Sequence, residues 1–181
     1  MEKTVDNRLK WIKTGYQLFG EIGLEALNVE KLSNLMGLNR SSFYHYFKDL
    51  MGYEEALFAY HDSRYQSIAL VIKDYQQFEQ LFNKEVFEHK DALAFQRQLL
   101  INQSVKRYKE CSEAVRRHTE ENTFALWTAA NSNAETSEKQ WAMFKAMRDF
   151  YFVHHGQSNG LENPKEFMLL LNQYVNQQLD H

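Results

Sequence analysis

The sequence predicts an all-α fold, and three observations support this prediction. The 181-residue chain contains one Pro and seven Gly, too few for the many tight turns of an all-β protein. Its contents of 44% hydrophobic and 25% charged residues are ordinary for a globular protein. Apolar residues recur at the spacing of a buried helix face through most of the chain.

The first predicted helix covers about residues 5–22. Gly15 lies within it and leaves room for a neighbouring side chain, and Gly23 is well placed to end it. Its apolar residues follow helical spacing: Leu9, Ile12, Tyr16 and Phe19.

Two short helices are predicted next, over residues 29–36 and 40–47. Asn28 can cap the first by accepting a hydrogen bond from an amide of the first turn, and Asn39 can cap the second. Gly37 lies between them and can take the positive φ that ends one helix and redirects the chain. A helix, a tight Gly-containing turn and a second helix are typical of a helix-turn-helix motif. The buried face of the first short helix comprises Val29, Leu32 and either Leu35 or Met36.

The second short helix contains a dense run of aromatic residues, which its periodicity divides between two faces. Phe43 and Phe47 share a face with the nearby Leu38, so we expect them in the core. The other side can form hydrogen bonds and is partly cationic, as a helix placed against phosphates requires. An alternative is that this outer face contacts another domain or a second copy of the chain. The outer set is Arg40, Ser41, Tyr44 and His45, with Lys48 just beyond the helix.

The remainder of the chain is predicted to be a series of longer helices. The last has a clear start, with Asn163 as its cap, Pro164 in the first helical position and Glu166 three residues after the cap. The predicted helices cover about residues 51–75, 76–89, 90–110, 112–132, 134–156 and 164–179. Together these elements predict two domains, over residues 1–50 and 51–181.

The segment LFGEIGLEALNVEKLSNLMGLNRSSFYHYFKD, which ends at Asp49, resembles the TetR family of bacterial transcriptional regulators. The resemblance covers about residues 9–50. It implies an N-terminal three-helix DNA-binding domain followed by a larger helical ligand-binding and dimerisation domain. The sequence departs from the family pattern at Ser41, where Gly is usual, at Leu50, where a second basic residue is usual, and at Met51, where an acidic residue is frequent.

The resemblance also implies a set of DNA contacts, and the chemistry of these side chains suits the role. Tyr44 offers a hydroxyl to a phosphate and a ring to a thymine methyl, and Lys48 offers a point charge. Arg40 can contact either a phosphate or a guanine in the major groove. The implied DNA-binding residues are Asn28, Asn39, Arg40, Ser41, Ser42, Tyr44, His45 and Lys48.

Other function classes find little support in the sequence. It contains no Gly-rich phosphate loop, no HExxH motif and no nucleophile elbow, so we expect neither an enzyme nor a cofactor. His154 and His155 are adjacent and would point about 100° apart on a helix, so no metal site is expected there. Cys111 is the single cysteine, and the chain has neither a signal-peptide-like start nor an apolar run long enough to span a membrane. These features favour a cytoplasmic protein.

The expected function is a DNA-binding transcriptional regulator, specifically a homodimeric repressor that binds a palindromic operator and responds to a small molecule. Two alternatives remain: a helix-turn-helix regulator controlled by a partner protein, and a ligand-binding protein that no longer binds DNA. The expected dimer interface consists of the last two helices, about residues 135–157 and 164–179.

Ligand response would require a pocket and a mechanical link to the DNA-binding end. The helix over residues 52–75 connects the two domains and can act as a lever. We expect an apolar or aromatic pocket for an effector of unknown identity, although single aromatic residues in this region can also be ordinary core. The expected pocket residues are Phe95, Leu99, Gln103, Tyr108, Phe124 and Trp127.

Overall fold

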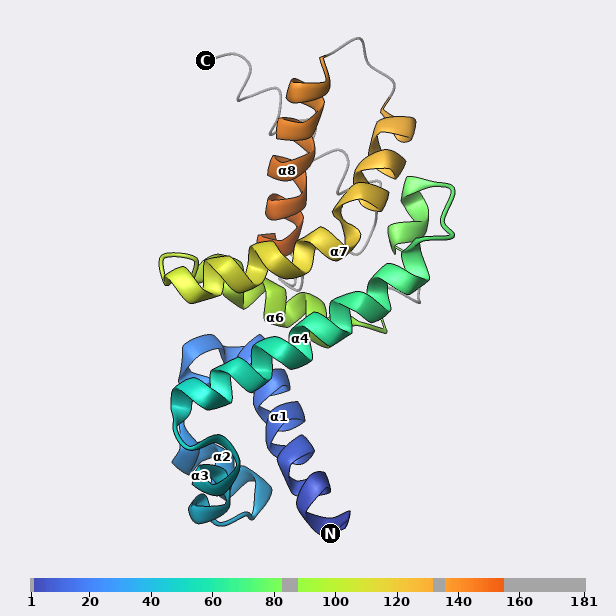
Figure 1. The fold of residues 1–181 in the computed structure, drawn as a ribbon. Coiled ribbons are helices and arrows are strands. Elements are labelled where there is room, and N and C mark those ends of the chain that lie inside the picture. The colour runs from blue at the N-terminus through green and yellow to red at the C-terminus, as the bar shows by residue number, and fades with distance from the viewer. Residues whose placement is uncertain (1, 83–87, 132–135, 155–181) are drawn as a thin grey trace.

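The computed structural model describes residues 2–82, 88–131 and 136–154, and every regular element within these ranges is a helix. The all-α prediction is therefore confirmed. Figure 1 shows α1, α2 and α3 at one end of the molecule and α8 at the other, with α4, α6 and the first part of α7 between them.

The N-terminal head consists of α1 (Glu2–Ile22), η1 (Gly23–Ala26), α2 (Val29–Met36) and α3 (Arg40–Phe47). The bounds of α2 and α3 agree with those predicted, and α1 begins three residues earlier than predicted. Of the two candidates for the inner face of α2, Met36 packs against the core and Leu35 is exposed.

The helix α4 (Leu50–Ile72) packs against α1 and α3, and its contact with α7 extends from Glu54, which bonds to Tyr108, to Asp62, which bonds to His118. The helix α4 crosses α1 closely, because Gly15 has no side chain and the ring of Tyr53 occupies that space. A Cβ atom on Gly15 would lie 1.7 Å from the Tyr53 hydroxyl oxygen, and this hydroxyl donates a hydrogen bond of 2.7 Å to the carbonyl of Trp11. The predicted role of Gly15 is confirmed.

The C-terminal helices are η2 (Phe78–Phe82), α6 (Lys90–Ile101), α7 (Lys106–Ala130) and α8 (Ser137–His154). Among the C-terminal helices, α6 packs against α1 of the head as well as against α7 and α8. The head and the C-terminal helices therefore share a hydrophobic cluster. That cluster contains residues from both sides of the predicted boundary at residue 50, among them Tyr16, Phe19, Phe43, Tyr53, Phe95 and Leu99.

The predicted division between helices 90–110 and 112–132 is wrong. The break lies at residues 102–105, six to nine residues before the expected break at Cys111, and α7 continues through Cys111. Asn102 lies at the C-cap of α6, where its side-chain amide donates to the carbonyl of Gln98 at 2.8 Å. Two ion pairs at i, i+4 spacing then support α7 across the expected break: Lys106 with Glu110 and Lys109 with Glu113.

The other predicted helices agree with the structure to different degrees. The helix predicted over residues 76–89 is a 3₁₀ segment at Phe78–Phe82, and residues 83–87 lie outside the described ranges. The helix α4 ends at Ile72 rather than at residue 75, and α8 is helical from Ser137 to His154, the last residue of the described ranges. The last predicted helix, residues 164–179, also lies outside the described ranges.

A chain of buried hydrogen bonds joins α1, α4, α6 and α7. The Tyr16 hydroxyl donates to His61 Nδ1 at 2.6 Å, and His61 Nε2 donates to the side-chain oxygen of Gln96 at 3.0 Å. The amide of Gln96 then donates to the Ser112 hydroxyl at 2.7 Å. Because the Gln96 oxygen can only accept, His61 must carry its proton on Nε2.

Candidate nucleic-acid interface

The two helices of the helix-turn-helix motif are held by local caps. The side chain of Asn28 accepts a hydrogen bond of 3.0 Å from the Lys31 amide, and Gly37 ends α2 with a φ of 64°. The side chain of Asn39 accepts a bond of 2.9 Å from the Ser41 amide, and α3 begins at Arg40. Both predicted caps are confirmed, and they set the angle at which α3 leaves α2.

The inner face of α3 is fixed in the aromatic core. Phe43 is 0% exposed, and its ring packs edge-on against Trp11 at 5.3 Å and against Tyr53 at 5.0 Å. Phe47 packs against the ring of Tyr53 at 4.8 Å. Ser42 is half-buried, and its hydroxyl donates to the carbonyl of Asn39 and accepts from the Trp11 indole at 3.4 Å. Ser42 therefore fastens α3 to the core.

The outer face of α3 has the composition that the sequence predicts. Tyr44 is 53% exposed, and Arg40, Ser41 and His45 are also exposed. Lys48 is exposed at the end of α3, where its amide bonds to the carbonyl of Tyr44. The face can therefore present a phenol, a hydroxyl, an imidazole and two cationic groups on one short helix.

Arg40 has a partner that the sequence analysis missed. Its guanidinium lies 2.5 Å from the carboxylate of Glu30 on α2, and both side chains are mostly exposed. An exposed ion pair of this kind contributes little to stability, so a phosphate can compete for the arginine. The signal in the sequence was an acidic residue two positions after the cap of α2, on the same surface as the cationic groups.

The structure does not bring the six expected pocket residues together. Phe95, Leu99 and Tyr108 belong to the cluster shared with the head, and Gln103 is exposed between α6 and α7. The ring of Phe95 stacks on that of Tyr16 at 4.3 Å, and the Tyr108 hydroxyl donates to Glu54 at 2.5 Å. Phe124 and Trp127 belong to a separate cluster with Phe144 and Met147.

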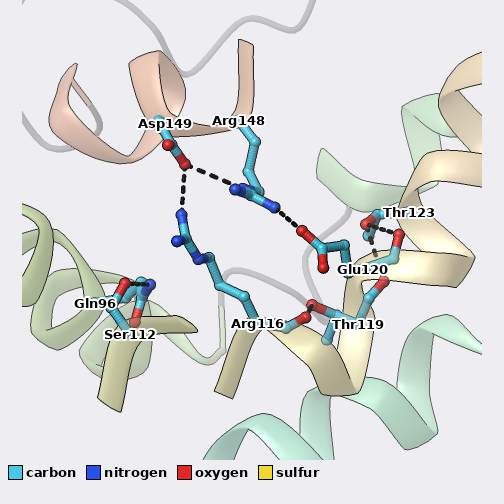
Figure 2. Close-up of polar contacts among 8 residues, drawn as sticks. All are labelled: Gln96, Ser112, Arg116, Thr119, Glu120, Thr123, Arg148 and Asp149. Atoms are coloured by element: carbon cyan, nitrogen blue, oxygen red, sulfur yellow. Dashed lines mark hydrogen bonds and ion pairs between the residues drawn. The ribbon is translucent and has the colours of Figure 1, made fainter. Parts of the chain in front are cut away.

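A cavity of about 110 Å³ lies instead among α4, η2, α6, α7 and α8. None of the six expected residues lines it. At its wall, Asp149 accepts from Arg116 at 2.7 Å and from Arg148 at 3.1 Å, and Arg148 also pairs with Glu120 (Figure 2). The lining residues are Tyr65, Ile68, Ile72, Phe78, Leu81, Leu93, Thr119, Thr123, Phe144, Met147, Arg148, Tyr151 and Phe152.

The described residues show few other groups that could bind a metal or react as a nucleophile. No three metal-ligating side chains gather within the described ranges, and His118 bonds to Asp62 at 2.7 Å. Burial raises the pKa of Cys111 to about 12, which keeps the thiol protonated and unreactive at neutral pH. No helix in the described part of the chain is long and apolar enough to cross a membrane.

Comparison with known proteins places the motif in a family. The profile of the family described as "Bacterial regulatory proteins, tetR family" matches residues 12–49, from the middle of α1 to the cap of α4. Searches of curated proteins and of solved structures returned no significant match. The matched segment contains both caps, the turn and the whole of α3. Residues 12–49 therefore form a DNA-binding domain like those of the bacterial TetR-type regulatory proteins, and this domain supports a DNA-binding transcriptional regulator.

Proposed function

We propose that the protein is a homodimeric repressor that binds a palindromic operator through α3 and releases it when a small molecule binds. The observation that carries the DNA-binding part is the division of α3 into a locked inner face and an exposed polar outer face. A helix fixed in this way can enter the major groove without losing its packing.

The outer face supplies contacts of three kinds. Tyr44 and Ser41 offer hydroxyls to phosphates, and Lys48 offers a charge at the end of the helix. Arg40, on leaving Glu30, can reach a phosphate or the edge of a guanine, and His45 can contact a base or a phosphate. Asn28 and Asn39 act through the helix starts that they cap, where free amides favour an anion.

The size of α3 supports a dimer. Eight residues at 1.5 Å per residue make a helix about 12 Å long, which covers one half-site only. A two-fold dimer would present two such helices to a palindrome. We keep the last two predicted helices as the proposed interface. One of them corresponds to α8, and residues 164–179 lie outside the described ranges.

The position of α4 supports ligand response. The first half of α4 packs against α1 and α3, and its second half contributes Tyr65, Ile68 and Ile72 to the cavity. A ligand in the cavity would therefore touch the same helix that follows α3. Release requires that the ligand bind the two conformations with different affinity, by about 2–3 kcal/mol for a change of about a hundredfold in operator affinity.

Selection of bound sequences from a random DNA pool tests the DNA-binding proposal. The full chain should enrich a palindrome whose half-sites are about one helical turn apart, and sedimentation at micromolar concentration should show a dimer. A Tyr44→Ala, Lys48→Ala chain is the negative control and should leave the pool unenriched. Enrichment of a site without two-fold symmetry by a monomer would contradict the proposal. Consistent co-purification of a protein that releases the DNA would instead favour control by a partner protein.

A further inference from the structure

The wall of the cavity among α4, α6, α7 and α8 contains a buried hydroxyl group without a hydrogen-bond partner among the described residues. Tyr65 lines the cavity and is 2% exposed, and its hydroxyl has no hydrogen-bond partner among the described residues. Burial raises the pKa of this phenol, so the hydroxyl keeps its proton and remains a donor at neutral pH. Buried polar groups in folded proteins are almost always paired, so an orphaned donor in a cavity wall indicates a missing acceptor.

Other buried tyrosines show that this protein normally satisfies such hydroxyls. Tyr16 donates to His61, Tyr53 to the carbonyl of Trp11, and Tyr108 to Glu54, at 2.6, 2.7 and 2.5 Å. Tyr65 lies on the same helix as Tyr53, and its ring packs edge-on against His61 at 4.9 Å. The lack of a partner therefore distinguishes Tyr65 from these three buried tyrosines.

The charges around the cavity are already balanced. Arg148 is the single charged residue among the described lining residues, and it is paired with both Glu120 and Asp149. Asp149 also pairs with Arg116, so two arginines face two carboxylates, as Figure 2 shows. A charged ligand would add one uncompensated charge to this partly buried network, which is costly. The balance therefore favours an uncharged ligand.

The rest of the lining is mainly apolar and aromatic. Ile68, Leu93 and Phe144 contribute hydrocarbon surface from three different helices. The hydroxyls of Thr119 and Thr123 already donate to backbone carbonyls of α7. The cavity of about 110 Å³ opens to solvent, so a compact molecule with one ring can place its polar end inside while the remainder lies at the opening.

We propose that this cavity binds a compact, uncharged and largely apolar molecule with one acceptor oxygen, which receives the hydroxyl of Tyr65. A ring bearing a carbonyl or an ether oxygen is the chemical class that fits. The inference rests on the proposed function in one respect: it names the class of effector that would release the operator.

Four probes of similar size and shape test the inference on the full chain without DNA. Acetophenone is neutral with one acceptor oxygen, isopropylbenzene lacks the oxygen, benzoate is an anion and benzamidinium is a cation. Calorimetric titration should show that acetophenone binds about five- to tenfold more tightly than isopropylbenzene, which is the effect of one hydrogen bond. Benzoate and benzamidinium should bind at least tenfold more weakly than acetophenone.

Two matched substitutions assign the preference to one hydroxyl. Tyr65→Phe removes only the proposed donor, so it should make the affinities for acetophenone and isopropylbenzene equal. Tyr53→Phe removes a hydroxyl that is bonded to Trp11 and is absent from the cavity lining, so it should preserve the preference. Tighter binding of benzoate than of acetophenone, or a preference that survives in Tyr65→Phe, would overturn the inference.

Operator binding, measured separately, distinguishes this inference from the proposed function. Acetophenone that binds through Tyr65 and leaves operator affinity unchanged would support the ligand class and reject ligand-responsive release. Failure of all four probes to bind a chain that still binds its operator would overturn the inference and leave the DNA-binding proposal intact.

Discussion

Hydroxyl groups of the buried tyrosines differ in whether removing them costs stability. The hydroxyl of Tyr53 closes the contact between α4 and the carbonyl of Trp11, directly above Gly15. The hydroxyl of Tyr65 has no partner among the described residues. The same chemical change at the two positions therefore has different consequences, because an unpaired buried donor has already lost its hydrogen bonds to water.

The residue-scale prediction compares these two positions. Tyr53→Phe should lower the free energy of unfolding by about 1 kcal/mol or more, because it leaves the Trp11 carbonyl without its donor. Tyr65→Phe should leave the free energy of unfolding unchanged or raise it by up to about 1 kcal/mol. Urea denaturation of both variants measures the difference. A loss in Tyr65→Phe equal to that in Tyr53→Phe would mean that Tyr65 has a partner in the unliganded protein.

At the scale of single elements, α3 combines strong local capping with an exposed polar surface. Its inner residues pack in the core of the head, its two ends are capped locally by Asn39 and by the Lys48 amide, and its outer side chains are exposed. Substitutions on the outer face should therefore change DNA binding and have little effect on folding.

Removal of one hydroxyl or one charge from α3 should weaken DNA binding in distinguishable ways. Tyr44→Phe should lower operator affinity through the loss of one phosphate hydrogen bond, at nearly unchanged salt dependence. Lys48→Gln should lower affinity and also reduce the slope of log affinity against log salt by about one. Lys73→Gln, an exposed lysine at the end of α4, is the matched control and should change neither quantity. Fluorescence anisotropy at several salt concentrations measures both.

Glu30 should act against DNA binding. Its carboxylate holds Arg40 and adds a negative charge beside the proposed phosphate contacts. Glu30→Gln should therefore raise operator affinity by about three- to tenfold at low salt, and by less at high salt because the interaction is exposed. The same anisotropy titration tests this. Affinity reduced by Glu30→Gln would mean that the ion pair holds Arg40 in its DNA-binding position.

The head could be predicted closely from the sequence because its signals are local. Asn28, Gly37 and Asn39 each act on amides or carbonyls within a few residues, so their effect can be read from the order of residues. The end of α6 at Asn102 has no neighbouring Gly or Pro and was missed. The cavity could not be predicted, because its lining comes from five elements and the important property of Tyr65 is that its hydroxyl has no hydrogen-bond partner among the described residues.

At the scale of the whole molecule, the head and the C-terminal helices are joined by a core that includes a buried histidine. His61 is fully buried and bonded on both sides, to Tyr16 of α1 and to Gln96 of α6. Burial lowers the pKa of His61 from 6.5 to about 4. Between these two pH values, His61 binds a proton in the unfolded chain and remains neutral in the folded protein.

The whole-molecule prediction is a loss of stability in mild acid. The contribution of His61 is complete above pH 6.5 and is lost as the pH falls from 6.5 towards 4, because only the unfolded chain binds the proton in that window. The loss should be about 3 kcal/mol by pH 4. Urea denaturation across this range, compared with His61→Gln, isolates the effect. An equal pH dependence in the variant would assign the acid sensitivity to other groups.

The buried chain from Tyr16 to Ser112 also has a consequence for how the sequence can diverge. Tyr16 donates to His61, His61 donates to Gln96, and Gln96 donates to Ser112. A substitution at one of these positions therefore removes the donor or the acceptor that the next residue needs. A descendant that replaced His61 by an aliphatic residue would leave the Tyr16 hydroxyl and the side-chain oxygen of Gln96 both unpaired, and selection would favour apolar replacements at those positions as well. Among relatives that share this core, positions 16, 61, 96 and 112 should therefore covary, although residue 16 is remote from the other three in the sequence.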